Sequence, residues 1–313
     1  MVECVKYNID HREKWDLFVK ACNTSLFFFN REYMEYHSDR FTDFSLLFFD
    51  KGEVIAVLPG TIDENIVTSH GGLTYGGLLL NPRIRYETVL DVLVMMKKTL
   101  SVAGCTKLVY KVVPYIFHGR PSEEVIYALH QSGARMYRRD LSTVISLGNR
   151  LKLSKGRKAQ ISRARKRGIK VVGSNDWDTF YSLLSSVLAA HSATPVHSSD
   201  ELKSLAERFP NNILLKIACL EGEMVAAILL FVFDGVVHTQ YMAANNIARE
   251  LGALDLLLED SIQEYQRKEF KYFSFGISTE NHGKTVNLGL INQKESFGGR
   301  GLVLDVFEVD LND

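Results

Sequence analysis

The sequence contains an internal repeat at low identity, and this repeat limits the folds that the chain can adopt. Residues 44–60 and residues 213–233 each read as an apolar strand, a two-residue turn and a second apolar strand. The pair Gly52-Glu53 in the first stretch matches Gly222-Glu223 in the second. Each stretch predicts a β-hairpin. A hairpin that recurs together with its neighbouring elements indicates two copies of one structural unit.

The elements after each hairpin repeat in the same order. In both halves a strand-like run is followed by an amphipathic helix, a short strand, another helix candidate and an alternating strand. The matched segments are 66–80 and 236–244, 86–100 and 251–265, 107–114 and 271–278, and 140–147 and 303–311. Gly52 lies 170 residues before Gly222, and Lys107 lies 164 residues before Lys271. The spacing is therefore nearly constant, which favours a duplicated unit.

This order of elements predicts an α/β fold with a mixed sheet covered by helices, because it lacks the regular βαβ series of a Rossmann fold. The order resembles the GNAT acyltransferase fold, and two such units in one chain resemble the Fem-type peptidyltransferases. We therefore expect two tandem GNAT-like acyl-CoA N-acyltransferase domains, at residues 1–149 and 171–313. A basic connecting helix is expected at 150–170.

The composition is that of a globular enzyme. The chain has 313 residues, 46% hydrophobic and 24% charged, and a formal net charge of zero, so no overall field draws it to DNA or to a membrane. No apolar run approaches the roughly 20 residues of a membrane span, and the N-terminus lacks the layout of a signal peptide. The four cysteines have no metal-ligand spacing. We expect a cytoplasmic protein with reduced thiols and no bound metal or covalent cofactor.

The expected connecting segment, 150–170, contains ten Lys or Arg residues and no acidic residue. One interpretation is a solvated helix whose aliphatic stems pack on the protein. The other is a strip that binds the phosphates of a nucleotide-linked acceptor or of a tRNA acceptor end, with Arg157, Lys158 and Arg163 as candidates. The absence of interleaved aromatic residues argues against single-strand binding by base stacking. Fem-type enzymes carry a similar basic helix here, which favours phosphate binding.

Segment 176–198 contains two candidate catalytic histidines. Its apolar spacing predicts a helix that runs out into a polar stretch with His191 and His197. A histidine can act as a general base because its ordinary pKa lies near working pH. The alternative interpretation is that His191 caps the helix and His197 is a surface loop residue.

Strand 236–244 is the second candidate catalytic segment and contains His238, Gln240 and Tyr241. Alternation predicts His238, Gln240 and Met242 on one face, with Tyr241 on the other. The GNAT resemblance implies that this strand splays from its neighbour and that its amides hold the acyl carbonyl, where an N–H aimed at the oxyanion stabilises the transition state. Gln240 then approaches the acceptor, and Tyr241 can protonate the leaving group. The alternative is ordinary pairing of a buried His or Tyr.

The segment after this strand approximates the GNAT pyrophosphate loop. In that loop, amides at a helix N-terminus bind phosphate, and Arg249, Gly252 and Ala253 occupy positions that the resemblance assigns to CoA binding. Leu254 departs from the pattern, because it stands where the family has a small residue. The departure leaves the donor open between acyl-CoA and the aminoacyl-tRNA that Fem-type enzymes use.

Polar residues near the C-terminus complete the set of candidates. Ser278, Asn287 and Lys294 lie at the end of a predicted strand and in the following loop or helix. They are candidate substrate-binding residues, and Lys294 can neutralise a phosphate or carboxylate. Together with the PVHS and HTQY segments, this run resembles tandem GNAT-like proteins of bacterial polysaccharide and envelope gene sets.

The leading hypothesis is an N-acyltransferase with its active site in the second domain. The enzyme would move an acyl group from a thioester donor, expected to be acyl-CoA, to an amine of a sugar, lipid or peptide envelope precursor. A second hypothesis is a Fem-like ligase that uses aminoacyl-tRNA. A third is a catalytically silent binding protein that retains the fold.

Overall fold

The computed structural model describes residues 1–190 and 193–312. The candidate His191 therefore lies outside the described residues. Contacts between residues divide the chain into two compact units. Unit 1 comprises residues 1–140, 281–285 and the chain from 303 onward, and unit 2 comprises residues 141–280 and 286–302.

Unit 1 contains short strands and four α-helices in the range 1–140. Its elements are β1 (Glu3–Lys6), α1 (Arg12–Ala21), α2 (Arg31–Met34), β2 (Thr42–Asp43), β3 (Leu46–Asp50), β4 (Glu53–Leu58), β5 (Thr61–Asp63), β6 (Ile66–Thr68), β7 (Leu79–Leu80), α3 (Tyr86–Val102), β8 (Lys107–Lys111) and α4 (Glu124–Gln131). Strands β1, β3, β4 and β7 form one ladder. Helices α3 and α4 pack with these strands in one apolar core.

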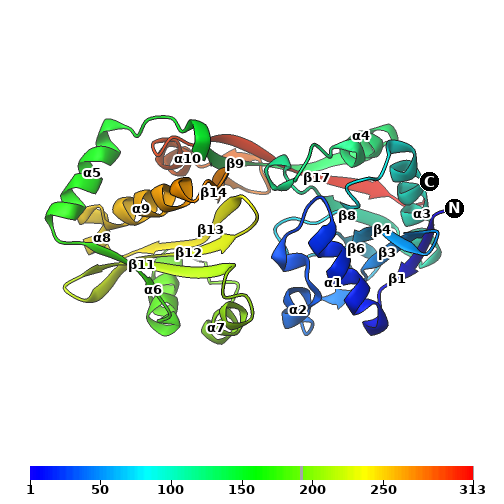
Figure 1. Ribbon diagram of the computed structural model, residues 1–313, viewed down its shortest axis with the longest axis horizontal. Helices are drawn as coiled ribbons and strands as arrows, with labels where there is room; N and C mark the ends of the chain where they lie inside the picture. Colours follow the sequence, from blue (N-terminus) through cyan, green and yellow to red (C-terminus); the bar gives the residue numbers. More distant parts are fainter. Residues whose placement is uncertain (191–192, 313) are drawn as a thin grey trace. The chain divides into compact units, whose positions relative to one another are not determined.

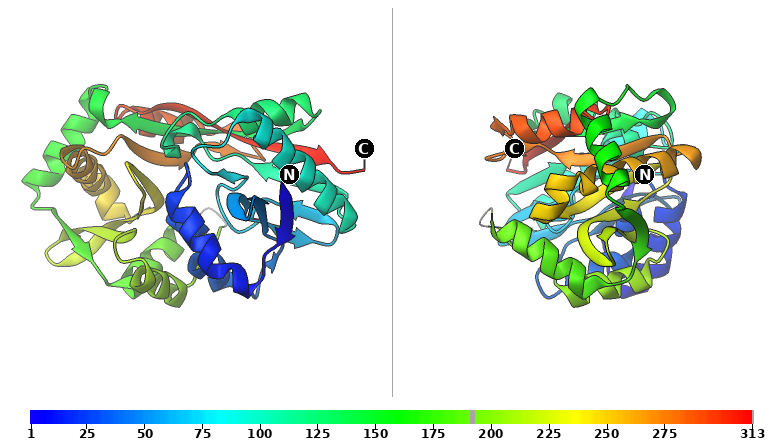
Figure 2. Two further views of the ribbon diagram at one scale, coloured as in Figure 1. Left: turned by 45° about the vertical axis from the view of Figure 1, so that its right-hand side comes forward. Right: turned by 90° about the vertical axis from the view of Figure 1, so that its left-hand side faces the viewer.

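Unit 2 is an α/β layer structure. Its elements are α5 (Lys155–Lys166), β10 (Lys170–Ser174), α6 (Trp177–Ala189), α7 (Ser199–Arg208), β11 (Ile213–Leu220), β12 (Glu223–Val232), β13 (Val236–Ala244), α8 (Asn246–Leu251), α9 (Ala253–Arg267), β14 (Tyr272–Ile277), β15 (Thr279–Glu280) and α10 (Leu288–Glu295). Within unit 2, α9 covers one face of the strands while α6 and α7 cover the other (Figures 1 and 2). The apolar core lies between the strands and α5, α8 and α9.

Three strands contain residues from both units. They are β9 (Arg135–Ser146), β16 (Thr285–Val286) and β17 (Arg300–Asp310). The sequence placed 141–149 in the first domain and 303–313 in the second. In the structure, β9 pairs with β14 through residues of unit 2, and β17 pairs with β8 through residues of unit 1. Strand β9, which ends the first predicted domain, therefore pairs in unit 2, and β17, which ends the second, pairs in unit 1. Local sequence patterns do not predict such an exchange, because it depends on pairing between residues far apart in the chain.

The predicted hairpins are confirmed. Strands β3 and β4 pair as antiparallel neighbours, and so do β11 and β12. Both turn residues have positive φ in each hairpin, at Lys51 and Gly52 and at Glu221 and Gly222. Two residues with positive φ match the twist of the flanking strands, which is why a glycine recurs at both turns. In the described part of the chain, no helix combines the length and apolar character needed to cross a membrane.

Candidate functional site

The central strands of unit 2 are paired only at their beginning. Strand β13 pairs with β14 in parallel at Val236, Val237 and His238, and no pair is formed after His238 and Ser274. Strand β13 nevertheless continues to Ala244 and β14 to Ile277. We call the opening between residues 239–244 and 275–277 the fork. The backbone groups that face each other here are not paired between the two strands, so those without another partner can bind a ligand.

A β-bulge distorts β13 at the start of the fork. Thr239 pairs with Leu230 and Tyr241 pairs with Leu229, so Gln240 is an extra residue on β13. A bulge leaves the extra residue outside the regular pairing and turns the strand locally. The backbone of Gln240 is therefore placed next to the opening.

The bulge also changes which side chains share a face. Thr239 and Met242 pair with residues of the core beneath α9, so these two residues lie on the α9 face. His238 and Tyr241 lie together on the opposite face. The predicted alternation of His238 with Gln240 and Met242, opposite Tyr241, was wrong because one inserted residue shifts the phase of all later side chains.

Tyr241 is paired with a histidine from the segment between α6 and α7. Its Oη lies 2.9 Å from Nδ1 of His197, and the two rings meet edge to face. Burial raises the pKa of Tyr241, partly offset by the backbone N–H groups of Val196 and His197. The phenol therefore keeps its proton at neutral pH and can donate it to a leaving group. Both His197 and Tyr241 were predicted from sequence, and the structure brings them together.

His238 is held by the neighbouring strand. Its Nδ1 lies 3.0 Å from Oγ of Ser274. Burial lowers the pKa of His238 to about 4, and the charge of Lys294 adds to the shift. The imidazole is therefore neutral at pH 7, which makes it a weak general base for an amine.

Lys294 extends from α10 to the β14 side of the fork. Its Nζ donates to the carbonyl oxygens of Gly276 at 2.9 Å and Ile277 at 2.6 Å. The side chain is 3% exposed, and burial lowers its pKa to about 8. The register with β9 shifts between Ser274 and Ile277, so Gly276 has no partner residue on β9. The ammonium is thus a buried positive charge at the fork, available to a developing anion.

The other predicted polar residues of this region differ in role. Asn287 caps α10 by accepting from the Leu290 amide and also donates to Glu280. Ser278 is 1% exposed, and its Oγ has no hydrogen-bond partner among the described residues. A buried hydroxyl without a partner is costly in an ordinary core, so it marks a position where a ligand can supply one.

Sequence reasoning missed two hydroxyl groups on β9. Ser142 and Thr143 are fully buried, and neither side-chain oxygen has a partner in the described part of the chain. The register places Ser142 on the same face as Ser274, and therefore on the His238 face. Two adjacent hydroxyl residues in an apolar strand could have been noticed in the sequence. Only the pairing of β9 with β14 shows that Ser142 lies on the same face as His238.

The predicted pyrophosphate loop is folded into helices. The Arg249 amide donates to Asn245 within α8, and Gly252 links α8 to α9 in the left-handed conformation with φ 76°. A Cβ on Gly252 would lie 2.7 Å from the carbonyl oxygen of Gln160 on α5. Helix α5 therefore packs directly on the junction that precedes Ala253. These residues do not fit the pyrophosphate of CoA bound at the start of α9.

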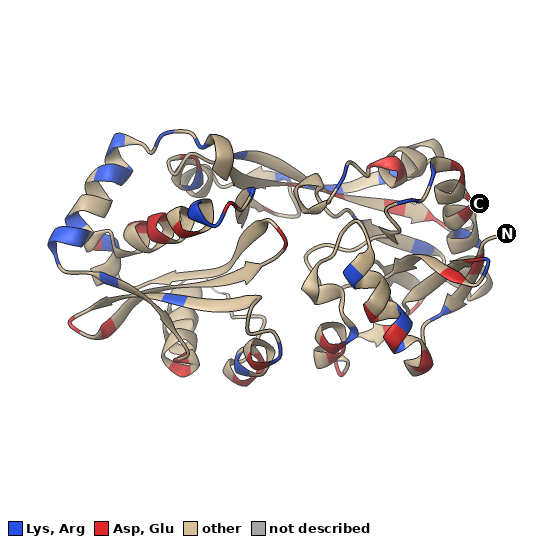
Figure 3. Ribbon diagram, in the orientation of Figure 1, with Lys and Arg blue, Asp and Glu red and all other residues tan. Residues whose placement is uncertain are grey.

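Two of the three predicted phosphate-binding cations instead attach α5 to unit 2. Arg157 forms an ion pair with Asp255, donates to Ser296 at 2.7 Å and lies over the ring of Phe297. Arg163 donates to the carbonyl oxygen of Glu250 at 3.0 Å. Lys158, by contrast, is exposed. Figure 3 shows the concentration of basic residues along α5.

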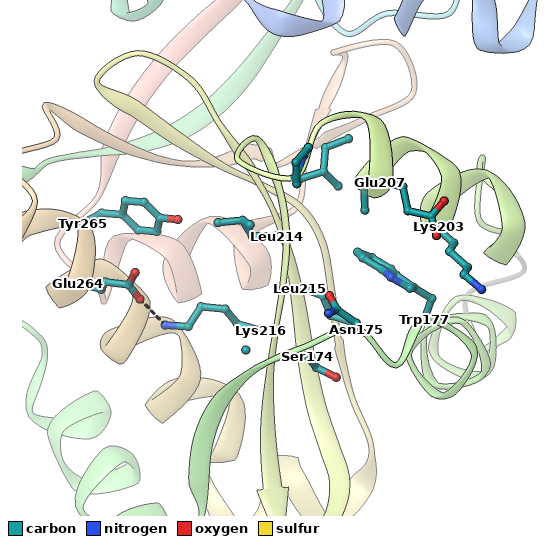
Figure 4. Close-up of a pocket in the computed structure, with 14 residues that line it drawn as sticks. Ser174, Asn175, Trp177, Lys203, Glu207, Leu214, Leu215, Lys216, Glu264 and Tyr265 are labelled. Atoms are coloured by element: carbon teal, nitrogen blue, oxygen red, sulfur yellow. Dashed lines mark hydrogen bonds and ion pairs between the residues drawn. The ribbon is translucent and has the colours of Figure 1, made fainter. Parts of the chain in front are cut away.

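A pocket of about 770 Å³ lies at a different place in unit 2 (Figure 4). Trp177 of α6, Lys203 of α7 and Lys216 of β11 line it, and none of its lining residues belongs to β13, β14 or α10. Lys216 is bound to Asp260 and Glu264. The pocket is therefore separate from the fork, and its most buried cation is already neutralised.

Part of the chain matches a known domain family, and its fold matches solved structures. Residues 154–284 match the family model described as the acetyltransferase (GNAT) domain, and this range contains β13, β14 and the fork. A solved tandem GNAT protein from the clavulanic acid biosynthesis pathway superposes with a TM-score of 0.53 at 12% identity, covering 100% of this chain and 99% of that one. The chain has a tandem GNAT fold.

Other solved structures share the fold over the whole chain. FemX superposes with a TM-score of 0.70 at 12% identity and covers 99% of this chain and 98% of its own. L-PGS from Bacillus licheniformis superposes with a TM-score of 0.65 at 12% identity, with coverage of 98% and 93%. No curated protein matches the sequence. The match to the GNAT domain model indicates an acyltransferase, and the fold of the chain resembles that of FemX.

Proposed function

We propose that this protein is an N-acyltransferase and that the reaction takes place at the fork of unit 2. The observation that carries the proposal is the separation of β13 from β14 beside a bulge, with the buried Lys294 ammonium on the β14 side. An acyl carbonyl placed there would meet a backbone amide of β13 that is not paired with β14 on one side. On the other side it would meet the positive charge of Lys294. Such preorganised groups stabilise the oxyanion of acyl transfer.

The residues of the fork supply the remaining chemistry. In the proposed reaction the acceptor nitrogen attacks the acyl carbon, the bond from that carbon to the carrier breaks, and the amine loses a proton to water. Tyr241 donates a proton to the leaving oxygen or sulfur and regains one from solvent, while His197 orients the phenol. His238, with a pKa of about 4, positions β14 through Ser274 rather than serving as the base at neutral pH.

The corresponding opening in unit 1 is filled by the chain itself. Strands β6 and β8 pair in parallel only as far as Thr68 and Val109, and residues 69–78 then pack along β8. The Leu78 amide donates to Tyr110 Oη at 2.8 Å, and Lys111 Nζ donates to the carbonyl oxygens of residues 70, 71 and 73. This difference supports placing the reaction in unit 2.

The contacts of α5 favour a different acyl donor from the one expected from the sequence. Acyl-CoA was expected, but α5 packs against Gly252, and Arg157 binds Asp255 in the first turn of α9. Both contacts lie where a CoA pyrophosphate would bind. This observation favours the second donor, an aminoacyl-tRNA, which is bound without that loop in the Fem-type enzymes that the chain resembles. The proposed acceptor remains an amine of an envelope precursor.

The donor and the reaction class can be tested together. Labelled acetyl-CoA and a mixture of labelled aminoacyl-tRNAs would be incubated with the protein and a panel of amino sugars and aminolipids, and transfer of label would be measured. We expect transfer from aminoacyl-tRNA. Tyr241→Phe should lower the rate about a hundredfold, the low end for loss of a positioned acid. Tyr127→Phe, at an exposed position in unit 1, is the matched control.

The outcomes separate the parts of the proposal. Transfer from acetyl-CoA with the same dependence on Tyr241 would overturn the choice of donor but not the reaction class. If neither donor bound or transferred its label, the reaction class itself would be wrong, and a binding role for the fold would replace it.

A further inference from the structure

Helix α5 presents a straight stripe of lysines to solvent. Lys155, Lys158, Ser162 and Lys166 follow one another at spacings of three, four and four residues, which places them on one side of the helix. All four are exposed. The helix has 12 residues, so the stripe extends over about 18 Å at 1.5 Å per residue.

The opposite side of α5 is fixed to unit 2. Ile161 and Ala164 are buried in the core that also contains α9. Arg157 adds its ion pair with Asp255 on the same side. The orientation of the helix is therefore set by packing, and the lysine stripe cannot turn inward without breaking these contacts.

The charge of the stripe is not neutralised within the protein. Among the described residues, Lys155, Lys158 and Lys166 make no ion pair, and the sequence from 150 to 170 contains no acidic residue. Unpaired charges on a fixed surface give a local positive potential even when the net charge of the chain is zero. Such a potential attracts a polyanion.

Exposed aliphatic side chains lie near both ends of α5. Leu151, 45% exposed, precedes the helix, and Val172, 46% exposed, follows it. Ile247 is 50% exposed on α8, and α8 is joined to α5 by the hydrogen bond from Arg163 to the Glu250 carbonyl. Single exposed aliphatic residues are ordinary. Exposed aliphatic side chains close to a lysine-rich helix are the combination by which proteins bind a lipid headgroup layer.

We propose that α5, together with the exposed Leu151 that precedes it and the exposed Ile247 on the adjoining α8, binds an anionic lipid surface. The stripe faces the headgroups, and the two aliphatic side chains enter the boundary of the acyl region. A nucleic acid fits less well, because segment 150–170 has no aromatic residue on which bases could stack. The proposal concerns a surface and is independent of the reaction at the fork.

Vesicle sedimentation tests the proposal with the full chain. The protein should bind phosphatidylcholine vesicles that contain phosphatidylglycerol and should not bind pure phosphatidylcholine. Each lysine near an anionic surface contributes about a fivefold effect, so Lys155→Gln, Lys158→Gln and Lys166→Gln together should weaken binding about a hundredfold. Binding should also weaken in 1 M salt, where the Debye length falls to about 3 Å.

Two controls distinguish lipid binding from a general effect of charge. The first replaces Lys20, Lys98 and Lys203, which are exposed lysines outside α5, with Gln and should leave vesicle binding unchanged. The second, Leu151→Ser with Ile247→Ser, should weaken vesicle binding but not retention on heparin. The proposal is wrong if the chain ignores anionic vesicles, or if the α5 triple variant binds them normally. It is also wrong if a structured RNA, but no vesicle, shows the dependence on α5.

Discussion

Replacing Lys294 with Met should separate stability from activity. The side chain is 3% exposed, and its ammonium donates to the carbonyl oxygens of Gly276 and Ile277. Methionine has a similar length and no charge, so the packing of α10 is preserved while the electrostatic contribution is removed. The change therefore isolates the role of one buried charge at the fork.

Two opposing contributions set the effect on stability. The pKa of Lys294 falls from 10.5 to about 8, so the buried ammonium costs about 3 kcal/mol at neutral pH. Removing the ammonium relieves that cost but leaves two carbonyl groups without this donor, at about 1–3 kcal/mol each. The contributions largely offset each other, and the free energy of unfolding at pH 7.5 should change by no more than about 3 kcal/mol. The rate of acyl transfer should fall about a hundredfold to a thousandfold, as for other lost oxyanion donors.

The pH dependence gives a second readout. Between pH 8 and 10.5 the unfolded chain holds a proton that the native Lys294 has released, so the wild type gains stability as pH rises. Relative to Lys294→Met, this gain should be about 2 kcal/mol between pH 7.5 and 9.5. Urea unfolding at the two pH values measures the gain, and Lys268→Met, at a position 54% exposed, is the control.

Two results would refute this reasoning. A difference in unfolding free energy that is the same at both pH values would mean that Lys294 is not a buried cation with a lowered pKa. A transfer rate within tenfold of the wild type would mean that its charge does not act on the reaction.

Two further predictions concern His238 and Gly252. Because burial lowers the pKa of His238 to about 4, the wild-type transfer rate should show no ascending limb from His238 between pH 5.5 and 7.5, and a limb in that range that disappears in His238→Ala would contradict this assignment. Gly252→Ala should destabilise the protein by about 2–4 kcal/mol, because it adds a Cβ at φ 76° and 2.7 Å from the Gln160 carbonyl. Gly222→Ala, at φ 95° with open space around it, should cost only about 1 kcal/mol in the same chemical denaturation assay. Equal losses in the two variants would show that α5 does not press on Gly252.

Local sequence patterns predicted the elements that depend on near neighbours. The hairpin turns at Gly52 and Gly222 and the strand 236–244 were confirmed. The predicted helices 86–100 and 251–265 correspond to α3 and α9. Predicted strand 66–80 was correct only at its ends, because residues 69–78 pack along β8 rather than pairing as a strand. That loop is held by Tyr110 and Lys111, which lie more than thirty positions later.

The candidate site was predicted in part. The sequence identified His197, Tyr241, His238 and Lys294 by residue type, but not their relations to one another. The phase of Tyr241 depends on the bulge at Gln240, which is a property of the pairing with β12. Ser142 was missed because only the pairing of β9 with β14 shows which face of the sheet its side chain occupies.

By itself the sequence determined the order of strands and helices, their duplication and the basic character of 150–170, because hydrophobic period, turn chemistry and charge are local properties. Only the tertiary structure decided which strand closes each unit, where β13 leaves β14, and that α5 occupies the junction before α9. It also decided the charge states at the fork, where burial lowers the pKa of His238 and of Lys294. These features arise from contacts between residues far apart in the chain, and desolvation has no counterpart in a local pattern.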